Sequence, residues 1–318
     1  MTYFFVFTLL LLGYKTYTIA ADRWNIIDKP NGRSSHSSIT IRGGGIIFPL
    51  AALLWFLLFG FQHPWAIAGL VLIAVISFLD DLFTLSRGLR MFFHFIAVTL
   101  LFWEISLLDL SWHYWLPVYI VLIGWINAFN FMDGINGITP LYSLVALGTF
   151  LFLSFFESVL ISNDFIKILS ISGLIFAFIN ARKRAKAFAG DVGSVSMAFL
   201  LGWFMLELII STQRIEYILF FGVYGVDSVF TILHRLGKGK NIFKAHRSHL
   251  YQFLANELNI PHVTVSALYA GVQSAINFVV ILMIRADLMN YPVFIAILLA
   301  LSGLYIFARF KVIKVIYN

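Results

Sequence analysis

The chain has no cysteine, and charged residues make up only 12% of its 318 residues. Without cysteine it can form neither a disulfide nor a thiolate metal site. Soluble globular domains have about 25% charged residues, and disordered or nucleic-acid-binding segments depend on charge even more. The scarcity of charge therefore excludes a soluble enzyme, a disordered protein and a nucleic-acid-binding domain.

Hydrophobic residues take the place of the missing charges. They form 61% of the chain, including 34 phenylalanines, against about 45–50% in ordinary domains. A soluble fold cannot bury so much apolar surface. One membrane-spanning helix needs about 20 apolar residues, so eleven helices would use most of the chain. The composition predicts an all-α polytopic membrane bundle with 10–11 transmembrane helices, forming a single domain over residues 1–318.

Eleven apolar segments mark the expected spans. They cover residues 2–21, 43–61, 65–80, 91–108, 114–128, 139–157, 165–180, 192–211, 215–233, 263–284 and 292–309. The first segment has no basic residue before its apolar stretch, which favours a retained span over a cleaved signal peptide.

Basic residues are distributed unevenly between the two sets of loops. With these spans, 18 Lys and Arg residues lie on one side and 3 on the other, although the net charge is only +7. Because basic loops stay in the cytoplasm, the N-terminus is predicted outside and the C-terminus inside. The positive charge therefore mainly reports topology, and no nucleic-acid partner is expected.

The predicted cytoplasmic loops also contain most of the polar clusters. These loops cover residues 22–42, 80–90, 127–138, 180–194 and 234–262. Loops held by a rigid scaffold often carry functional residues. We therefore expect one active site at the cytoplasmic boundary of the membrane.

Two adjacent carboxylates, Asp80 and Asp81, end the third span. They could simply terminate the helix in water. Alternatively, they could bind Mg²⁺ or act as a base near a phosphate, because Mg²⁺ prefers carboxylates together with phosphate oxygens. Burying two like charges at a membrane boundary is unfavourable, and both interpretations remain open.

The segment from Asn127 to Gly137 combines Asn127, Asn130 and Asp133 with two glycines. Carboxamides can hydrogen-bond a base or a sugar, and exposed backbone amides can hold a phosphate. The alternative is a plain turn between helices. A turn does not explain two asparagines within the preceding apolar helix, which favours a binding role.

Asp191 opens the eighth span, shortly after the basic run at residues 182–186, and Asn180 ends the span before it. The aspartate could be a helix cap or a metal ligand with cations nearby for phosphates. The basic run is typical of a topology signal.

The longest cytoplasmic loop carries His246, Arg247 and His249. No cysteine or third neighbouring ligand completes a zinc site, so contact with phosphate or sugar, or proton transfer, fits better. Incidental loop histidines are the alternative. Asp227 lies within a span, where an ionisable group is a functional candidate. As a proton relay it would instead suit a secondary transporter or channel, and a non-catalytic scaffold is a third possibility.

Four motifs connect these segments. They are FLDD at 78–81, NAFNFMDGING at 127–137, AGDVGS at 189–194 and AHRSHLYQ at 245–252, with residues 28–46 as a fifth matching piece. Together they resemble the polyprenyl-phosphate N-acetylhexosamine-1-phosphate transferases of the glycosyltransferase family 4 type. This family includes the phospho-N-acetylmuramoyl-pentapeptide translocase. The resemblance is to the branch that initiates O-antigen, capsule and common polysaccharides.

The resemblance implies a bacterial inner-membrane enzyme that works on two substrates. It would transfer a sugar-1-phosphate, by default GlcNAc-1-phosphate, from a UDP-N-acetylamino sugar to undecaprenyl phosphate and release UMP. It would require Mg²⁺, with Mn²⁺ as a substitute. The family also leads us to consider a homodimer.

The resemblance further implies roles for individual residues. Asp191 would bind the metal. The catalytic set would be Asp80, Asp81 and Asp133, with Asp80 as the base in many proposals. Substrate contacts would come from Asn127, Asn130, Asn180, His246, Arg247 and His249.

The chain also departs from the family pattern at three points. Arg247 and Ser248 stand between His246 and His249, where the family has a continuous run of histidines, and this difference bears on which sugar is chosen. Asn136 stands where many members have aspartate, and no lysine follows the FLDD motif. Arg87 or Arg90 could replace that lysine.

Overall fold

The computed structural model describes residues 1–30, 35, 38–156, 161–241 and 247–317. Within this part the chain is nearly all helical, which confirms the predicted membrane bundle. Its larger helices are α1 Thr2–Arg23, α2 Ile47–Leu58, α3 Pro64–Phe83, α4 Arg87–Glu104, α5 Trp112–Met132, α6 Ile138–Leu153, α7 Asn163–Asn180, α8 Gly190–Thr212, α9 Gly222–Gly237, α11 His262–Arg285 and α12 Tyr291–Tyr317.

Every predicted apolar segment coincides with one of these helices. In the described part of the chain, eight helical stretches are long and apolar enough to cross a membrane. Two more are apolar but shorter, at Gly44–Leu58 and Ile138–Leu153, while α4 carries three charged residues. The number of spans, 10 or 11, therefore stays a prediction.

Short elements complete the fold. They are the short helices η1 Gly44–Ile46, η2 Leu107–Asp109, η3 Ile215–Phe221, α10 Leu250–Gln252 and η4 Phe253–Glu257, and the strands β1 Ile27–Asp28 and β2 Thr40–Ile41. The two strands pair antiparallel. The sequence did not predict this two-stranded sheet, since two-residue strands leave no periodic pattern.

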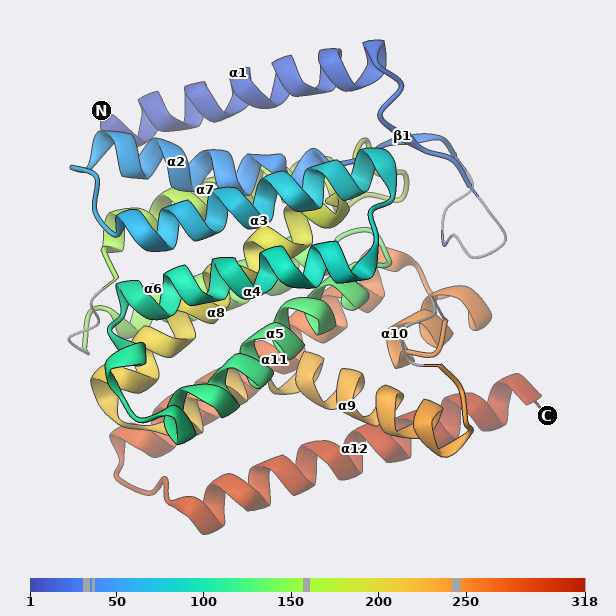
Figure 1. Ribbon diagram of the computed structural model, residues 1–318. Helices are drawn as coiled ribbons and strands as arrows, with labels where there is room; N and C mark the ends of the chain where they lie inside the picture. The colour runs from blue at the N-terminus through green and yellow to red at the C-terminus, as the bar shows by residue number, and fades with distance from the viewer. Residues whose placement is uncertain (31–34, 36–37, 157–160, 242–246, 318) are drawn as a thin grey trace.

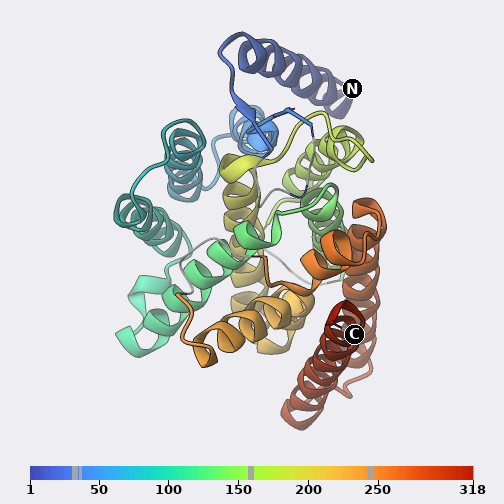
Figure 2. The same ribbon diagram turned by 90° about the vertical axis from the view of Figure 1, so that its right-hand side faces the viewer.

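Helix α8 runs through the middle of the bundle, and α1 and α12 lie at its edges (Figure 2). Accordingly, 83% of the most apolar window of α8 is buried, against 17% for α1 and 11% for α12. A helix that is apolar on all sides is suited either to a protein core or to lipid. The same composition thus serves a core helix and two peripheral, lipid-facing ones.

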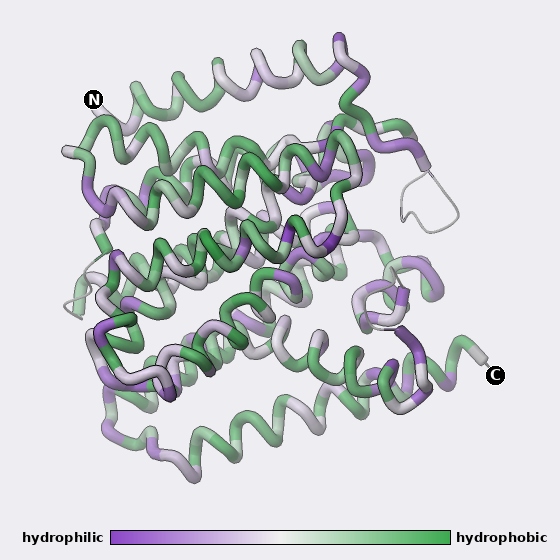
Figure 3. The backbone as a smooth tube through the Cα atoms, in the orientation of Figure 1, coloured by the Kyte–Doolittle hydropathy of each residue, from purple (hydrophilic) through white to green (hydrophobic). Residues whose placement is uncertain are grey.

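The predicted functional loops meet at one end of the bundle. Helices α3, α5, α7 and α9 end there and α8 begins there, on the right of Figure 1, while the N-terminus lies at the opposite end and the C-terminus at this one. Hydrophobic residues cover the long helices, and hydrophilic residues gather towards their ends (Figure 3). Which side of a bilayer this end faces stays a prediction.

Glycines let η1 pack directly on the segment that leads into α8. The N–H groups of Gly44 and Gly45 donate to the carbonyls of Phe188 and Ala189, at 2.8 and 3.0 Å. Gly190 has φ +70°, and a Cβ there would lie 2.6 Å from Asp81 Oδ2. Only glycine accepts this conformation without strain. The close approach therefore brings Asp81 to the first turn of α8.

We expect Gly190→Ala to lower both stability and activity. An alanine would pay roughly 1–3 kcal/mol for the left-handed backbone and would push the Asp81 carboxylate away. Thermal unfolding in detergent and an activity assay on the same preparation measure both effects. Gly271→Ala is the matched control, because it lies inside α11 and a Cβ there meets nothing within 4 Å. Equal behaviour of the two variants would contradict the expectation.

Candidate active site

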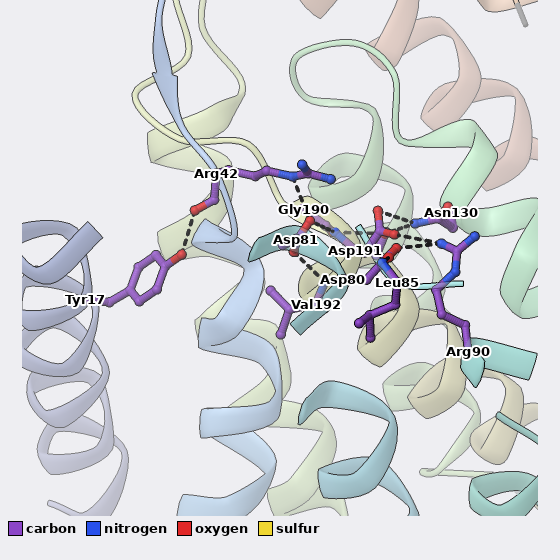
Figure 4. A network of polar contacts seen from close by, with 11 residues as sticks. Tyr17, Arg42, Asp80, Asp81, Leu85, Arg90, Asn130, Gly190, Asp191 and Val192 are labelled. Atoms are coloured by element: carbon purple, nitrogen blue, oxygen red, sulfur yellow. Dashed lines mark hydrogen bonds and ion pairs between the residues drawn. The ribbon is translucent and has the colours of Figure 1, made fainter. Parts of the chain in front are cut away.

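Three carboxylates from two helices meet at this end of the bundle (Figure 4). Asp80 and Asp81 lie in the last turn of α3, and Asp191 lies in the first turn of α8. The Asp191 side chain is 22% exposed, compared with 8% for Asp80 and 0% for Asp81. Asp191 is thus the most accessible of the three to a ligand.

Asp81 caps the N-terminus of α8. Its two oxygens accept the backbone N–H groups of Asp191 and Val192, each at 3.0 Å. Arg42 Nε lies 2.7 Å from Asp81 Oδ1. A carboxylate at a helix N-terminus satisfies orphan donors and interacts favourably with the helix dipole. Asp81 therefore holds the first turn of α8, and with it Asp191, against the end of α3.

Arg90 connects the other two carboxylates. Its Nη1 lies 2.7 Å from Asp80 Oδ2 and 3.3 Å from Asp191 Oδ2. The second oxygen of Asp80 accepts the N–H of Leu85 at 2.6 Å. Neighbouring carboxylates repel each other unless a cation lies between them. Arg90 supplies that cation and keeps the Asp80 and Asp191 side chains together.

Asn130 extends the network to α5. Its Nδ2 donates to Asp191 Oδ1 at 3.1 Å and to Ser194 Oγ at 2.9 Å. Asn127, one turn earlier on the same helix, instead donates to the carbonyl of Ile123 at 2.8 Å. Of the two predicted asparagines, the structure therefore brings Asn130 into contact with the carboxylates.

Asp133 follows the end of α5 and accepts a 2.5 Å hydrogen bond from the Thr139 hydroxyl. Burial raises the pKa of Asp133 from 3.8 to about 6; the Thr139 hydrogen bond opposes the rise, and the charge of Asp81 adds to it. Asp133 thus lies near the carboxylate cluster in an environment that disfavours its charge.

We expect Asp133→Asn to make the protein more stable at neutral pH. A raised carboxylate pKa means that ionisation costs folding free energy, so stability falls as pH rises from about 4 through 6. The pKa shift corresponds to a loss of folding free energy of at most about 3 kcal/mol. The actual loss should be smaller, because Asp133 is only partly buried. Thermal unfolding of the variant and wild type at pH 4 and pH 8 tests this. The variant should be more stable only at pH 8, and an advantage independent of pH would refute the burial cause.

Asn180 braces the loops around the site. It is 4% exposed, its Oδ1 accepts the N–H of Gly137 at 2.6 Å, and its Nδ2 donates to the carbonyl of Ala187 at 2.9 Å. Both ends of the carboxamide therefore join the start of α6 to the loop before α8. Its predicted pyrophosphate contact stays a prediction.

The histidine motif lies in a separate network. His246 falls outside the described residues, Arg247 is half-buried, and His249 is 2% exposed. His249 Nδ1 lies 3.1 Å from Asp227 Oδ1. The structure thus pairs His249 with the intramembrane aspartate and not with the three carboxylates.

Two residues of the site were not in the predicted set. Arg42 contacts Asp81, and its carbonyl accepts a 2.6 Å hydrogen bond from Tyr17 of α1. Arg90 was considered only as a replacement for a missing lysine. The signal in the sequence was their position, with Arg42 directly before three glycines and Arg90 in the first turn after the Asp80 helix. Both lay among residues interpreted as topology signals.

The donor set fits a metal that is shared with substrate. Among the described residues, no group of three or more His, Asp or Glu side chains could hold a metal ion alone. Mg²⁺ is usually bound by one or two carboxylates together with substrate phosphates and water. A partly exposed Asp191 beside Asp80 matches that kind of site.

Comparison with known proteins identifies the class of this site. The sequence profile of glycosyl transferase family 4 matches residues 63–209, which contain all three carboxylates and Asn130. The match covers a little under half of the chain, and together with the relatives described below it makes the chain similar to glycosyl transferase family 4. It is therefore an enzyme, a sugar-1-phosphate transferase of the membrane. Similarity to this family favours an enzyme over the transporter, channel and scaffold alternatives.

Individual family 4 relatives match at about one residue in four. The chain is 27% identical over 261 residues to the undecaprenyl-phosphate alpha-N-acetylglucosaminyl 1-phosphate transferase of Thermotoga maritima, covering 76% of this chain and 77% of that protein. The Escherichia coli K12 protein of the same name is 27% identical over 274 residues, which cover 79% of this chain and 74% of that protein. The T. maritima phospho-N-acetylmuramoyl-pentapeptide-transferase is 27% identical over 219 residues, which cover 63% of this chain and 70% of that protein.

Proposed function

We propose that this family 4 enzyme transfers N-acetylhexosamine-1-phosphate from a UDP-sugar to undecaprenyl phosphate and releases UMP. By default the sugar is GlcNAc, and the product begins the synthesis of a cell-surface polysaccharide. Two of the relatives carry this activity in their names. The observation that carries the proposal is the Asp80–Arg90–Asp191 cluster at one end of a membrane bundle.

The reaction joins a lipid to a soluble nucleotide, which explains the position of the cluster. An oxygen of the acceptor phosphate attacks the sugar-bound phosphorus of the donor, the pyrophosphate bond breaks, and UMP leaves with that bond's electron pair. The prenyl tail has to stay in lipid while its phosphate meets the nucleotide. A cluster at the ends of the α3 and α8 spans meets both requirements.

Phosphoryl transfer depends mainly on positioning and on neutralising charge. In our proposal Asp191 holds Mg²⁺ with help from Asp80, and the ion, when bound, neutralises phosphate charge. Asp80 orients the acceptor phosphate, which is already anionic and needs little help from a base. Arg90, with 33% of its side chain exposed, keeps the two carboxylates together in the absence of substrate.

The remaining predicted residues surround the nucleotide sugar. We assign Asp133, Asn127 and Asn130 to the nucleotide side, Asn180 to the pyrophosphate side, and His246, Arg247 and His249 to donor recognition. Asp81 acts through the first turn of α8, because its oxygens are occupied by backbone N–H groups and by Arg42. The site would face the cytoplasm of a bacterial inner membrane, where UDP-sugars are made.

Release of UMP tests the proposal. Purified protein in detergent should release UMP from a UDP-N-acetylamino sugar only when undecaprenyl phosphate is present. A panel of UDP-GlcNAc, UDP-GalNAc, UDP-N-acetylfucosamine and a UDP-diamino sugar then identifies the donor. Release without the lipid would indicate a hydrolase, and no release from any donor would refute the proposal.

A further inference from the structure

Asp227 is a fully buried aspartate within the membrane-spanning part of α9. Five donors surround its carboxylate. Tyr269 OH donates to Oδ2 at 2.7 Å, whereas Oδ1 receives four contacts at 3.1–3.3 Å, from Tyr305 OH, Thr231 Oγ1, the N–H of Leu250 and His249 Nδ1. A buried charge is tolerated when such partners replace water. Because its carboxylate oxygens are already occupied by these donors, Asp227 is suited to holding its partners in place.

The donors come from four separate parts of the chain. Asp227 and Thr231 belong to α9, Tyr269 to α11 and Tyr305 to α12, while His249 and Leu250 belong to the histidine motif. Arg309 of α12 donates from Nη1 to Tyr305 OH at 2.7 Å and to Thr231 Oγ1 at 3.2 Å. Arg309 is only 8% exposed, and its positive charge acts on the Asp227 carboxylate through these two hydroxyl groups.

Helix α12 packs on the rest of the molecule at this place. It is exposed along most of its length, with only 11% of its most apolar window buried. Tyr305 nevertheless forms a small hydrophobic cluster with Val226 and Leu250, separate from the main core. Besides packing on the main core near its start, through residues such as Val293 and Phe294, α12 thus has a second packing site beside the histidine motif.

The network continues from His249 towards the carboxylate cluster. The His249 ring stacks on that of Tyr251, with centroids 5.7 Å apart. Tyr251 OH donates to the carbonyl of Phe131 at 2.9 Å, two residues before Asp133. Asp227 is thus linked through His249 and Tyr251 to the end of α5.

We propose that Asp227 is a positioning residue which fixes His249, and that α12 contributes Tyr305 and Arg309 to complete this support for donor binding. The inference rests on the proposed function, because donor binding is the step it affects. Asp227 touches no substrate and acts through His249. Binding of the acceptor phosphate should not depend on Asp227, since we place the acceptor beside Asp80 and Asp191.

Separate KM values for the two substrates test the inference. We expect Asp227→Asn to raise KM for the UDP-sugar about tenfold, as expected for hydrogen bonds to a buried charge, and Tyr305→Phe to raise it several-fold. KM for undecaprenyl phosphate should change less than about twofold in both. Tyr291→Phe is the matched control, because it removes the same hydroxyl from an exposed position on α12.

A double variant separates positioning from general destabilisation. If Asp227 acts through His249, then Asp227→Asn combined with His249→Asn should bind donor no worse than His249→Asn alone. Losses that multiply would overturn the inference, as would equal increases in both KM values accompanied by a lower Tm. Tyr305→Phe keeps the ring, so it still reports if Asp227→Asn fails to fold.

The same assay distinguishes this inference from the proposed function. A wild-type protein that releases no UMP overturns the proposed function and the inference together. An active wild type whose donor KM is unchanged by Asp227→Asn and by Tyr305→Phe overturns the inference alone.

Discussion

Replacing Asp191 by asparagine should reduce sugar-1-phosphate transfer by roughly 10³-fold or more while leaving the protein folded. The asparagine keeps the hydrogen-bond acceptor for Asn130 but loses the charge that a divalent cation requires. A metal ligand in phosphoryl transfer contributes several kcal/mol of transition-state stabilisation, and about 4 kcal/mol corresponds to 10³ in rate. UMP release by purified variant and wild type measures the loss.

Two controls show whether the loss is chemical. Asp22→Asn removes the same charge from an exposed residue near the end of α1 and should leave both activity and Tm unchanged. The Tm of the Asp191 variant itself should stay close to that of the wild type, because Asp81 and Val192 still fix the first turn of α8. Robust activity in the folded Asp191 variant would contradict the assignment of Asp191 as the metal ligand.

Chelation of divalent cations should stop turnover completely and reversibly. Excess EDTA removes the ion that we assign to Asp191, and Mg²⁺ or Mn²⁺ should restore the rate. Since no group of three or more His, Asp or Glu side chains among the described residues could hold a metal alone, we expect the ion to be shared with substrate. EDTA should therefore leave the Tm of the substrate-free protein unchanged.

Add-back experiments complete this test. EDTA already saturated with Mg²⁺ is the control for effects of the chelator itself and should leave the rate unaltered. Full turnover in free EDTA would refute the proposed metal requirement. A large fall of Tm in EDTA would instead indicate a structural metal site and would contradict the shared-ion assignment.

The membrane fold followed directly from composition and periodicity. Eleven apolar segments predicted helices, and each coincides with one. Such patterns survive without tertiary information because the bilayer demands long apolar helices whose backbone groups bond within the segment. The shortest elements were invisible for the opposite reason. Pairing of Ile27–Asp28 with Thr40–Ile41 depends on where the chain turns, and two residues show no period.

The site was predicted in part. Asp80, Asp81, Asp191 and Asn130 were all expected, and they do form one network. Arg42 was not, because a basic residue in a membrane protein is usually interpreted as a topology signal. Its contact with Asp81 depends on the glycine loop that packs on α8.

Sequence by itself determined that this is a helical membrane protein with acidic motifs at the ends of its spans. The tertiary structure decided how those motifs divide. It assigned Asp81 to the N-terminus of α8, left Asp191 partly exposed, and placed His249 beside Asp227. The physical reason is that a carboxylate's role depends on which donors surround it. Those donors come from helices far apart in sequence, and no local pattern records their distance.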